Sequence, residues 1–100
     1  MISVSPNRVV AMPWYSPNDY ERLRGMMSDQ HAMAAAYETW RASAHNNEQV
    51  AKDAGLTVVR VPIDPDAFAA WCAERDLALD SGARMRFANE AAASRGASAL

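Results

Sequence analysis

The chain is poor in the residues that stabilise secreted scaffolds, and it has no long apolar run. Only one of its 100 residues is cysteine, so it cannot form an internal disulfide, which is typical of a reducing compartment. No stretch approaches the ~18 to 20 apolar residues that cross a bilayer. The first residues also lack the charged lead and apolar run of a secretory signal. We therefore expect a cytoplasmic protein without a membrane partner.

Neither sign of charge dominates. Ten Lys and Arg stand against twelve Asp and Glu, a formal net charge of -2, which offers no general attraction to phosphate. Nucleic acid is therefore not the expected partner. Half of the residues are apolar, which favours a collapsed globular chain over a disordered one. A chain of this length has room for one core and one domain.

Two short segments are candidate strands. Residues 57–63, Thr-Val-Val-Arg-Val-Pro-Ile, are rich in β-branched side chains and predict a strand. Residues 8–12 are a weaker candidate, and we expect that strand to end at Pro13, because proline cannot donate to a ladder.

The first two helices have recognisable ends. Ser16 and the Pro-Asn-Asp that follows it form an N-cap pattern, which predicts a helix at about 17–27. A longer helix is predicted at about 33–54, with an apolar row that includes Tyr37 and Trp40. Gly55 should end this second helix in a left-handed conformation, with the next residue folding back on the last turn.

Two more helices follow the second strand. Asp64 with Pro65 predicts a capped helix at about 65–76. The last helix should begin at Asp80 or Ser81 and run through 81–94. The predicted core consists of Tyr20, Leu23, Met27, Tyr37, Trp40, Val59, Val61, Phe68, Trp71, Cys72 and Phe87.

The expected fold class is α+β and mainly α, with about four helices and one or two short strands in a single small domain. Residues 1–11 would be an N-terminal extension that contains the weaker strand, 12–94 the domain and 95–100 a flexible tail. The order of elements suggests a β-α-α-β-α-α arrangement, in which the two strands lie side by side and helices cover one face.

Three stretches carry a resemblance to known sequences. They are Pro13-Trp14-Tyr15 with Asp19-Tyr20, residues 59–72, and Phe-Ala-Asn-Glu-Ala at 87–91. Together they resemble a group of short, uncharacterised bacterial proteins over about residues 12–93. The resemblance transfers no functional residue. It implies that the shared part starts near Met12, which would leave the strand at 8–12 outside the fold.

A strand at 57–63 without a neighbour in its own chain would have unpaired backbone groups. The simplest partner would be the same strand of a second copy, antiparallel across a two-fold axis. We therefore expect a homodimer, with candidate partner contacts at Trp14, Tyr15, Val59 and Val61. For Trp14 and Tyr15 the favoured alternative is packing within the chain, onto the first helix or near Tyr37 and Trp40.

No group of residues reaches the specificity of an active site. Asp64 and Asp66 flank a proline at a helix start and are explained by capping. His45 and Glu48 have a ligand-like i, i+3 spacing but too few companions for a metal, and Cys72 lies in an apolar row as a small hydrophobic residue. The glycines form no phosphate-binding loop. We expect no enzymatic activity, no cofactor and no metal.

The leading functional hypothesis is a small non-enzymatic protein–protein interaction or regulatory module. The alternative is a dimeric, helix-turn-helix-like DNA-binding regulator that uses the helix at 81–94. Its candidate DNA contacts are Arg84, Arg86, Asn89 and Arg95.

Overall fold

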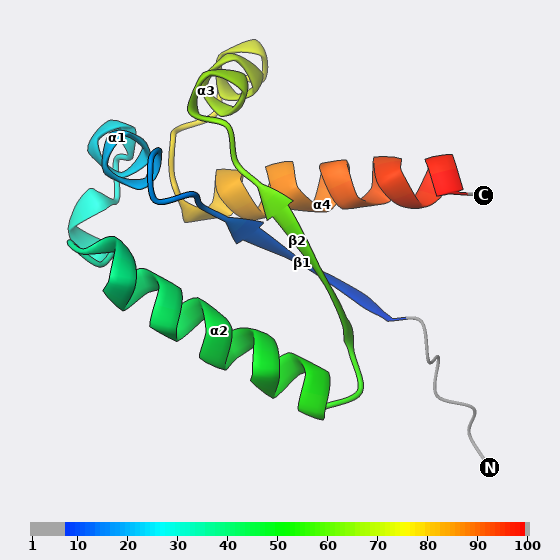
Figure 1. Ribbon diagram of the computed structural model, residues 1–100. Coiled ribbons are helices and arrows are strands. Elements are labelled where there is room, and N and C mark those ends of the chain that lie inside the picture. The colour runs from blue at the N-terminus through cyan, green and yellow to red at the C-terminus, as the bar shows by residue number, and fades with distance from the viewer. Residues whose placement is uncertain (1–7, 100) are drawn as a thin grey trace.

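Two strands and four α-helices follow one another in the expected β-α-α-β-α-α order (Figure 1). The computed structural model describes residues 8–99, with the backbone alone for 95–99. The elements are β1 (Val9–Trp14), α1 (Tyr20–Met26), the 3₁₀ turn η1 (Gln30–Ala32), α2 (Tyr37–Asp53), β2 (Thr57–Pro62), α3 (Pro65–Glu74) and α4 (Ser81–Ala99). The predicted fold class, α+β and mainly α, is confirmed.

The two strands pair with each other, in parallel, within one chain. Val9 lies opposite Thr57, and the register continues to Trp14 opposite Pro62. The strand at 8–12 therefore belongs to the fold, as the side-by-side arrangement predicted and contrary to what the resemblance implied. With β1 as its neighbour, the second strand needs no second copy to complete its ladder.

The backbone ladder explains why β1 continues through Pro13. The carbonyl oxygen of Arg8 accepts from the Thr57 N–H at 2.9 Å, and that of Trp14 accepts from the Ile63 N–H at 3.0 Å. In a parallel pair alternate residues bond to one neighbour, so the even-numbered residues of β1 bond to β2. Pro13 is odd-numbered, so the N–H that it lacks would point away from β2. The prediction that the strand ends at Pro13 was wrong for this reason.

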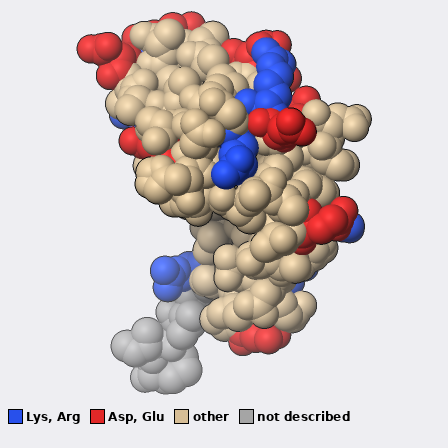
Figure 2. Space-filling model, turned by 90° about the vertical axis from the view of Figure 1, so that its left-hand side faces the viewer, with Lys and Arg blue, Asp and Glu red and all other residues tan. Residues whose placement is uncertain are grey.

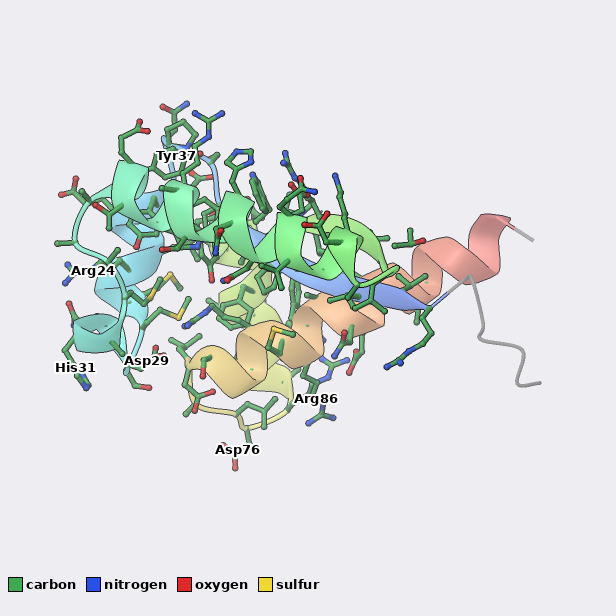
Figure 3. The ribbon with its side chains drawn as sticks, turned by 90° about the horizontal axis from the view of Figure 1, so that it is seen from below. Arg24, Asp29, His31, Tyr37, Asp76 and Arg86 are labelled. Atoms are coloured by element: carbon green, nitrogen blue, oxygen red, sulfur yellow. The ribbon has the colours of Figure 1, made fainter. Side chains whose placement is uncertain are left out.

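Helices cover both faces of the sheet, where the sequence had suggested one. Successive side chains of a strand point to opposite faces. Val61 packs with Ala11 and with Ala88 of α4, whereas the neighbouring Arg60 bonds to Glu48 of α2. The sheet is therefore enclosed between α4 on one face and α2 on the other (Figure 3).

The first two helices begin later than predicted. Ser16 caps a turn, since its Oγ accepts from the Asp19 N–H at 3.2 Å, and α1 starts only after that turn. Of the predicted helix at 33–54, only α2 forms, from Tyr37; the 3₁₀ turn η1 ends at Ala32, before the predicted start. Met33, predicted at its start, adopts an extended conformation instead.

The predicted helix boundaries at Gly55 and Asp64 are confirmed. Gly55 has a φ of 88°, and the Leu56 N–H reaches back to the Ala51 carbonyl at 3.1 Å, which is the expected C-terminal motif. The Asp64 carboxylate accepts from the Ala67 N–H at 2.8 Å. Asp80 caps α4 in the same way at 3.0 Å.

The core has two parts. The larger joins Tyr15 and Ile63, which directly follow β1 and β2, to α1, α2, α3 and α4. It is centred on Leu23 and Phe68, both fully buried. The smaller lies between the sheet and α4 around Val61. Every predicted core residue belongs to one of the two or packs against it.

The C-terminal helix is longer than expected. The predicted end was residue 94, but α4 continues to Ala99, so most of the predicted tail is helical. The side chains of 95–99, together with residues 1–7 of the predicted extension and residue 100, lie outside the described part. None of the helices between residues 8 and 99 is long and apolar enough to cross a bilayer.

Candidate functional site

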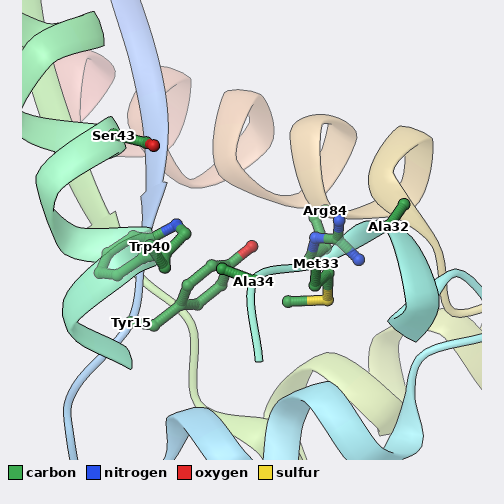
Figure 4. A pocket seen from close by; sticks show the side chains of 7 residues that line it. All are labelled: Tyr15, Ala32, Met33, Ala34, Trp40, Ser43 and Arg84. Carbon is green, nitrogen blue, oxygen red and sulfur yellow. The ribbon is translucent and has the colours of Figure 1, made fainter. Parts of the chain in front are cut away.

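A cavity of about 490 Å³ opens where the end of β1 meets the beginnings of α2 and α4 (Figure 4). Its size lies within the range of small-molecule sites. The residues that line it are Tyr15, Ala32, Met33, Ala34, Trp40, Ser43 and Arg84.

Aromatic rings form one wall of this cavity. The ring of Tyr15 lies 4.7 Å from that of Trp40 and 5.8 Å from that of Tyr20, measured between centroids. Tyr15 is only 5% exposed, and burial raises the pKa of its hydroxyl, against the lowering influence of Arg84. Of the two arrangements considered for Tyr15, a partner contact or packing near Trp40, the structure shows the packing, which joins the end of β1 to the core.

Trp14 was the other aromatic partner candidate, and it is half-buried against α2. Its ring meets Trp40 edge-on at 5.2 Å and His45 at 5.4 Å. The Arg60 guanidinium covers it at 3.8 Å from the ring centroid. Trp14 therefore contributes to packing on the α2 face of the sheet.

The opposite wall is an ion pair between α4 and the residue before η1. Arg84 donates two hydrogen bonds to the Asp29 carboxylate, at 3.1 and 3.2 Å. Its hydrogen bond holds the pKa of Asp29 below the usual value. Arg84, a candidate DNA contact, is buried and committed to this pair. Figure 4 shows Arg84 beside Met33, across the cavity from Trp40.

Two smaller cavities, of about 220 and 320 Å³, lie along the outer edge of β1, and we refer to them together as the β1-edge groove. The first shares Tyr15, Trp40, Ser43 and Arg84 with the aromatic cavity. The groove residues are Val9, Ala11, Met12, Pro13, Tyr15, Trp40, Ser43, Ala44, Asn47, Ser81, Arg84, Met85, Asn89, Ala92 and Ala93.

The β1-edge groove is apolar and almost without charge. Arg84 is the one charged residue among those that line it, and Asp29 neutralises that charge. Val9 and Met85 are large apolar side chains that remain 54% and 43% exposed there. Exposed apolar side chains that gather on one face are typical of an interaction surface. Sequence reasoning missed this groove, because it depends on how α4 lies beside β1.

The other partner candidates lie on β2 beneath α4. Val61 is 1% exposed, between Ala11 and Ala88, and Val59 is half-buried beside it. They face α4 of the same chain. The expectation that they form a surface came from treating β2 as a strand without a neighbour.

The remaining DNA candidates on α4 are divided. Arg86 is exposed and projects outward (Figure 3), with its Nε 3.5 Å from Glu90. Asn89 is also exposed but lines the β1-edge groove, and the side chain of Arg95 lies outside the described residues. Figure 2 shows acidic and basic side chains adjacent to one another on the face it draws, with no continuous basic patch.

Glu48 is a buried charge that sequence reasoning considered only as a possible metal ligand with His45. It is 7% exposed, and both of its oxygens accept from Arg60, at 2.7 and 2.8 Å. The hydrogen bond from Arg60 lowers the pKa of Glu48. The sequence signal for its burial was its position four residues after Ala44, which puts the two residues on the same face of α2.

The residues with catalytic potential are not brought together. Cys72 is buried in the core, and burial raises the pKa of its thiol, which disfavours the reactive thiolate. His31 is exposed on η1, where it points away from the core (Figure 3). Within residues 8–99, no three side chains of the His, Cys, Asp and Glu types are grouped to hold a metal ion.

Comparison with known proteins gives no match among family models, curated proteins or solved structures. The resemblance to short bacterial proteins therefore stays a prediction.

Proposed function

We propose that this chain is a small, non-enzymatic protein–protein interaction module of the cytoplasm that acts as a homodimer, with the β1-edge groove as the interface. The observation that carries the proposal is the near-absence of charge from a groove flanked by exposed apolar side chains. The groove contains aromatic and methionine side chains, and these residue types are enriched in protein–protein interfaces.

A second copy suits this groove because of how charge is distributed. A two-fold interface places the same surface against itself, so like charges would repel one another across it. A groove whose one charge is already neutralised, by Asp29, avoids that repulsion. A second copy can therefore approach it without bringing like charges together.

Both helices that border the groove keep charge away from it. On α4, Arg86 and Glu90 pair with each other and lie beside Trp71 of α3, whereas Met85 lines the groove. On α2, the uncharged Ser43 and Asn47 line it. Val50 follows three residues later, on the same side of the helix, and is 60% exposed.

The helix α2 has an uncharged side that borders the groove and a charged side elsewhere. Glu38, Arg41 and His45 gather with Ala42 on another side of α2. A charge added there should not affect an interface at the groove, which makes Ala42 a suitable control position.

The experiment is to measure mass in solution by sedimentation velocity over a concentration series. We expect wild-type protein to reach twice the 10.9 kDa mass of the chain. Met85→Glu places two like charges at the interface and should shift the equilibrium to monomer. Ala42→Glu adds the same charge at the control position and should leave the dimer intact.

A wild-type protein that stays monomeric throughout the series contradicts the proposal. So does a dimer that both variants weaken equally, because the effect would then follow net charge and not position. Circular dichroism of both variants checks that the fold is kept.

The DNA-binding alternative has a separate test. With Arg84 committed to Asp29, it would depend on Arg86, Asn89 and Arg95. Affinity for duplex DNA that falls steeply with salt would support it, and an Arg86→Ala variant should then bind more weakly. No retention on DNA at low salt would exclude it.

A further inference from the structure

We infer that the two copies join β1 to β1 in antiparallel orientation, so that the two-stranded sheets form one continuous four-stranded sheet. This inference rests on the proposed homodimer and specifies how its partner is held. The partner would be bound by backbone hydrogen bonds at the strand edge as well as by apolar side chains.

The first observation is the direction of the backbone groups of β1. Its even-numbered residues bond to β2, as the bonds at Arg8 and Trp14 show. Val9 and Ala11 therefore direct their N–H and C=O groups away from β2. Within the described residues β1 pairs with β2 alone, so these groups form an open edge of the kind that accepts another strand.

The second observation is the position of Pro13. It takes the third outward position of β1, where it can offer a carbonyl but no N–H. An antiparallel pair that places Val9 opposite Ala11 of the second copy makes four N–H···O bonds and leaves Pro13 out of the ladder. The proline thus favours pairing through the first half of β1, where both outward residues keep their N–H groups.

The third observation is the space beside that half of the strand. A cavity of about 320 Å³ lies between Val9, Ala11 and the α4 residues Asn89, Ala92 and Ala93. The small side chains on α4 leave room for a neighbouring strand and for the α4 helix that accompanies it. Helices with small residues at their contact can approach closely, at about 8 Å between axes.

The antiparallel orientation of the two copies also keeps the helices on their present faces of the sheet. A two-fold axis perpendicular to an antiparallel pair keeps each face of the joined sheet on one side. Both α4 helices would then cover one face and both α2 helices the other. The exposed Val9 would be covered by the second copy.

The test is Val9→Pro, which removes an outward N–H without touching the ladder to β2. The control is Val9→Ala, which shortens the same exposed side chain but keeps the N–H. We expect Val9→Pro to raise the dimer dissociation constant about tenfold or more, since two of the four bonds disappear. Val9→Ala should change it by about threefold or less. Sedimentation equilibrium measures the constants, and thermal unfolding of the monomer checks the fold.

Amide hydrogen exchange of the wild-type protein gives a second measurement that needs no variant. The Ala11 amide should exchange rapidly at low protein concentration and become protected as dimer forms, whereas the Val10 amide should be protected throughout. If dimer persists in Val9→Pro and the Ala11 amide stays unprotected, strand pairing is wrong and the homodimer stands. If wild-type protein never dimerises, the proposed function fails as well.

Discussion

Arg84→Met tests the ion pair that forms a wall of the aromatic cavity. The substitution keeps an apolar stem of similar length and removes the guanidinium, so Asp29 loses both of its bonds to Arg84. The Arg84 side chain is 9% exposed and that of Asp29 is 24% exposed. The pair is therefore neither a surface pair nor a fully buried one.

The burial of the pair sets the expected magnitude. Exposed ion pairs contribute about 0 to 1 kcal/mol, whereas removing one partner of a fully buried pair costs about 3 to 5 kcal/mol. Because water can reach part of the orphaned carboxylate, we expect a loss of about 2 kcal/mol in the free energy of unfolding. For a domain of this size that lowers Tm by roughly 8 to 16 °C.

The pH dependence separates the ion pair from simple packing. Arg84 lowers the pKa of Asp29 in the folded protein, so the pair stabilises fully above the unfolded value of about 3.9. That stability is lost as the pH falls through the lower, folded value. The difference between wild type and Arg84→Met should therefore shrink between about pH 7 and about pH 3.

Urea unfolding at both pH values provides the measurement, and Asp29→Asn completes a double-mutant cycle. The double variant should be less destabilised than the two single losses added together, because the interaction can be lost only once. The reasoning is refuted if Arg84→Met lowers the free energy of unfolding equally at both pH values. It is also refuted if the losses caused by Arg84→Met and Asp29→Asn simply add in the double variant.

The remaining predictions concern Phe68, two glycines and Cys72, and they can be checked by thermal or urea unfolding unless another assay is named. Phe68 is fully buried in the larger core, so Phe68→Ala should cost about 3 to 5 kcal/mol; a loss under about 1 kcal/mol would contradict its placement. Gly55→Ala should cost about 1 to 2 kcal/mol because its φ is 88°. Gly25 lies in α1, where an added Cβ would meet no neighbouring group within 4 Å, so Gly25→Ala should instead stabilise the protein by about 0.5 to 1 kcal/mol. Equal effects of the two glycine substitutions on the free energy of unfolding would contradict the difference in backbone conformation. The buried Cys72 thiol, whose pKa is raised by burial, should react with an aromatic disulfide reagent far more slowly in the folded protein than in urea; equal rates by absorbance would place it at the surface.

Features set by neighbouring residues could be predicted from the sequence. Gly55 with Leu56, and Asp64 with Pro65, carry their conformational preferences locally, and the structure uses both as expected. The apolar spacing around Phe68 likewise identified the core.

Features that depend on distant residues could not be predicted in this way. Pro13 interrupts the ladder only if the paired strand lies on the side to which its missing N–H would point. The local sequence does not indicate on which side that strand lies. Arg84 is a residue type that often contacts DNA. Its pairing with Asp29 follows from the way α4 packs beside that residue, which the sequence does not indicate. The β1-edge groove is made by three elements far apart in the chain, and no periodicity within one of them indicates it.

The parallel pairing of β1 and β2 has a consequence for synthesis of the chain. β1 leaves the ribosome first, and α1, η1 and α2 must all follow before its partner strand emerges. Closing so long a loop carries an entropic cost and slows folding. A nascent chain halted after α2 would therefore hold Trp14 without the Arg60 guanidinium that covers it. A chaperone that binds aromatic side chains should recognise that intermediate until β2 has emerged from the ribosome.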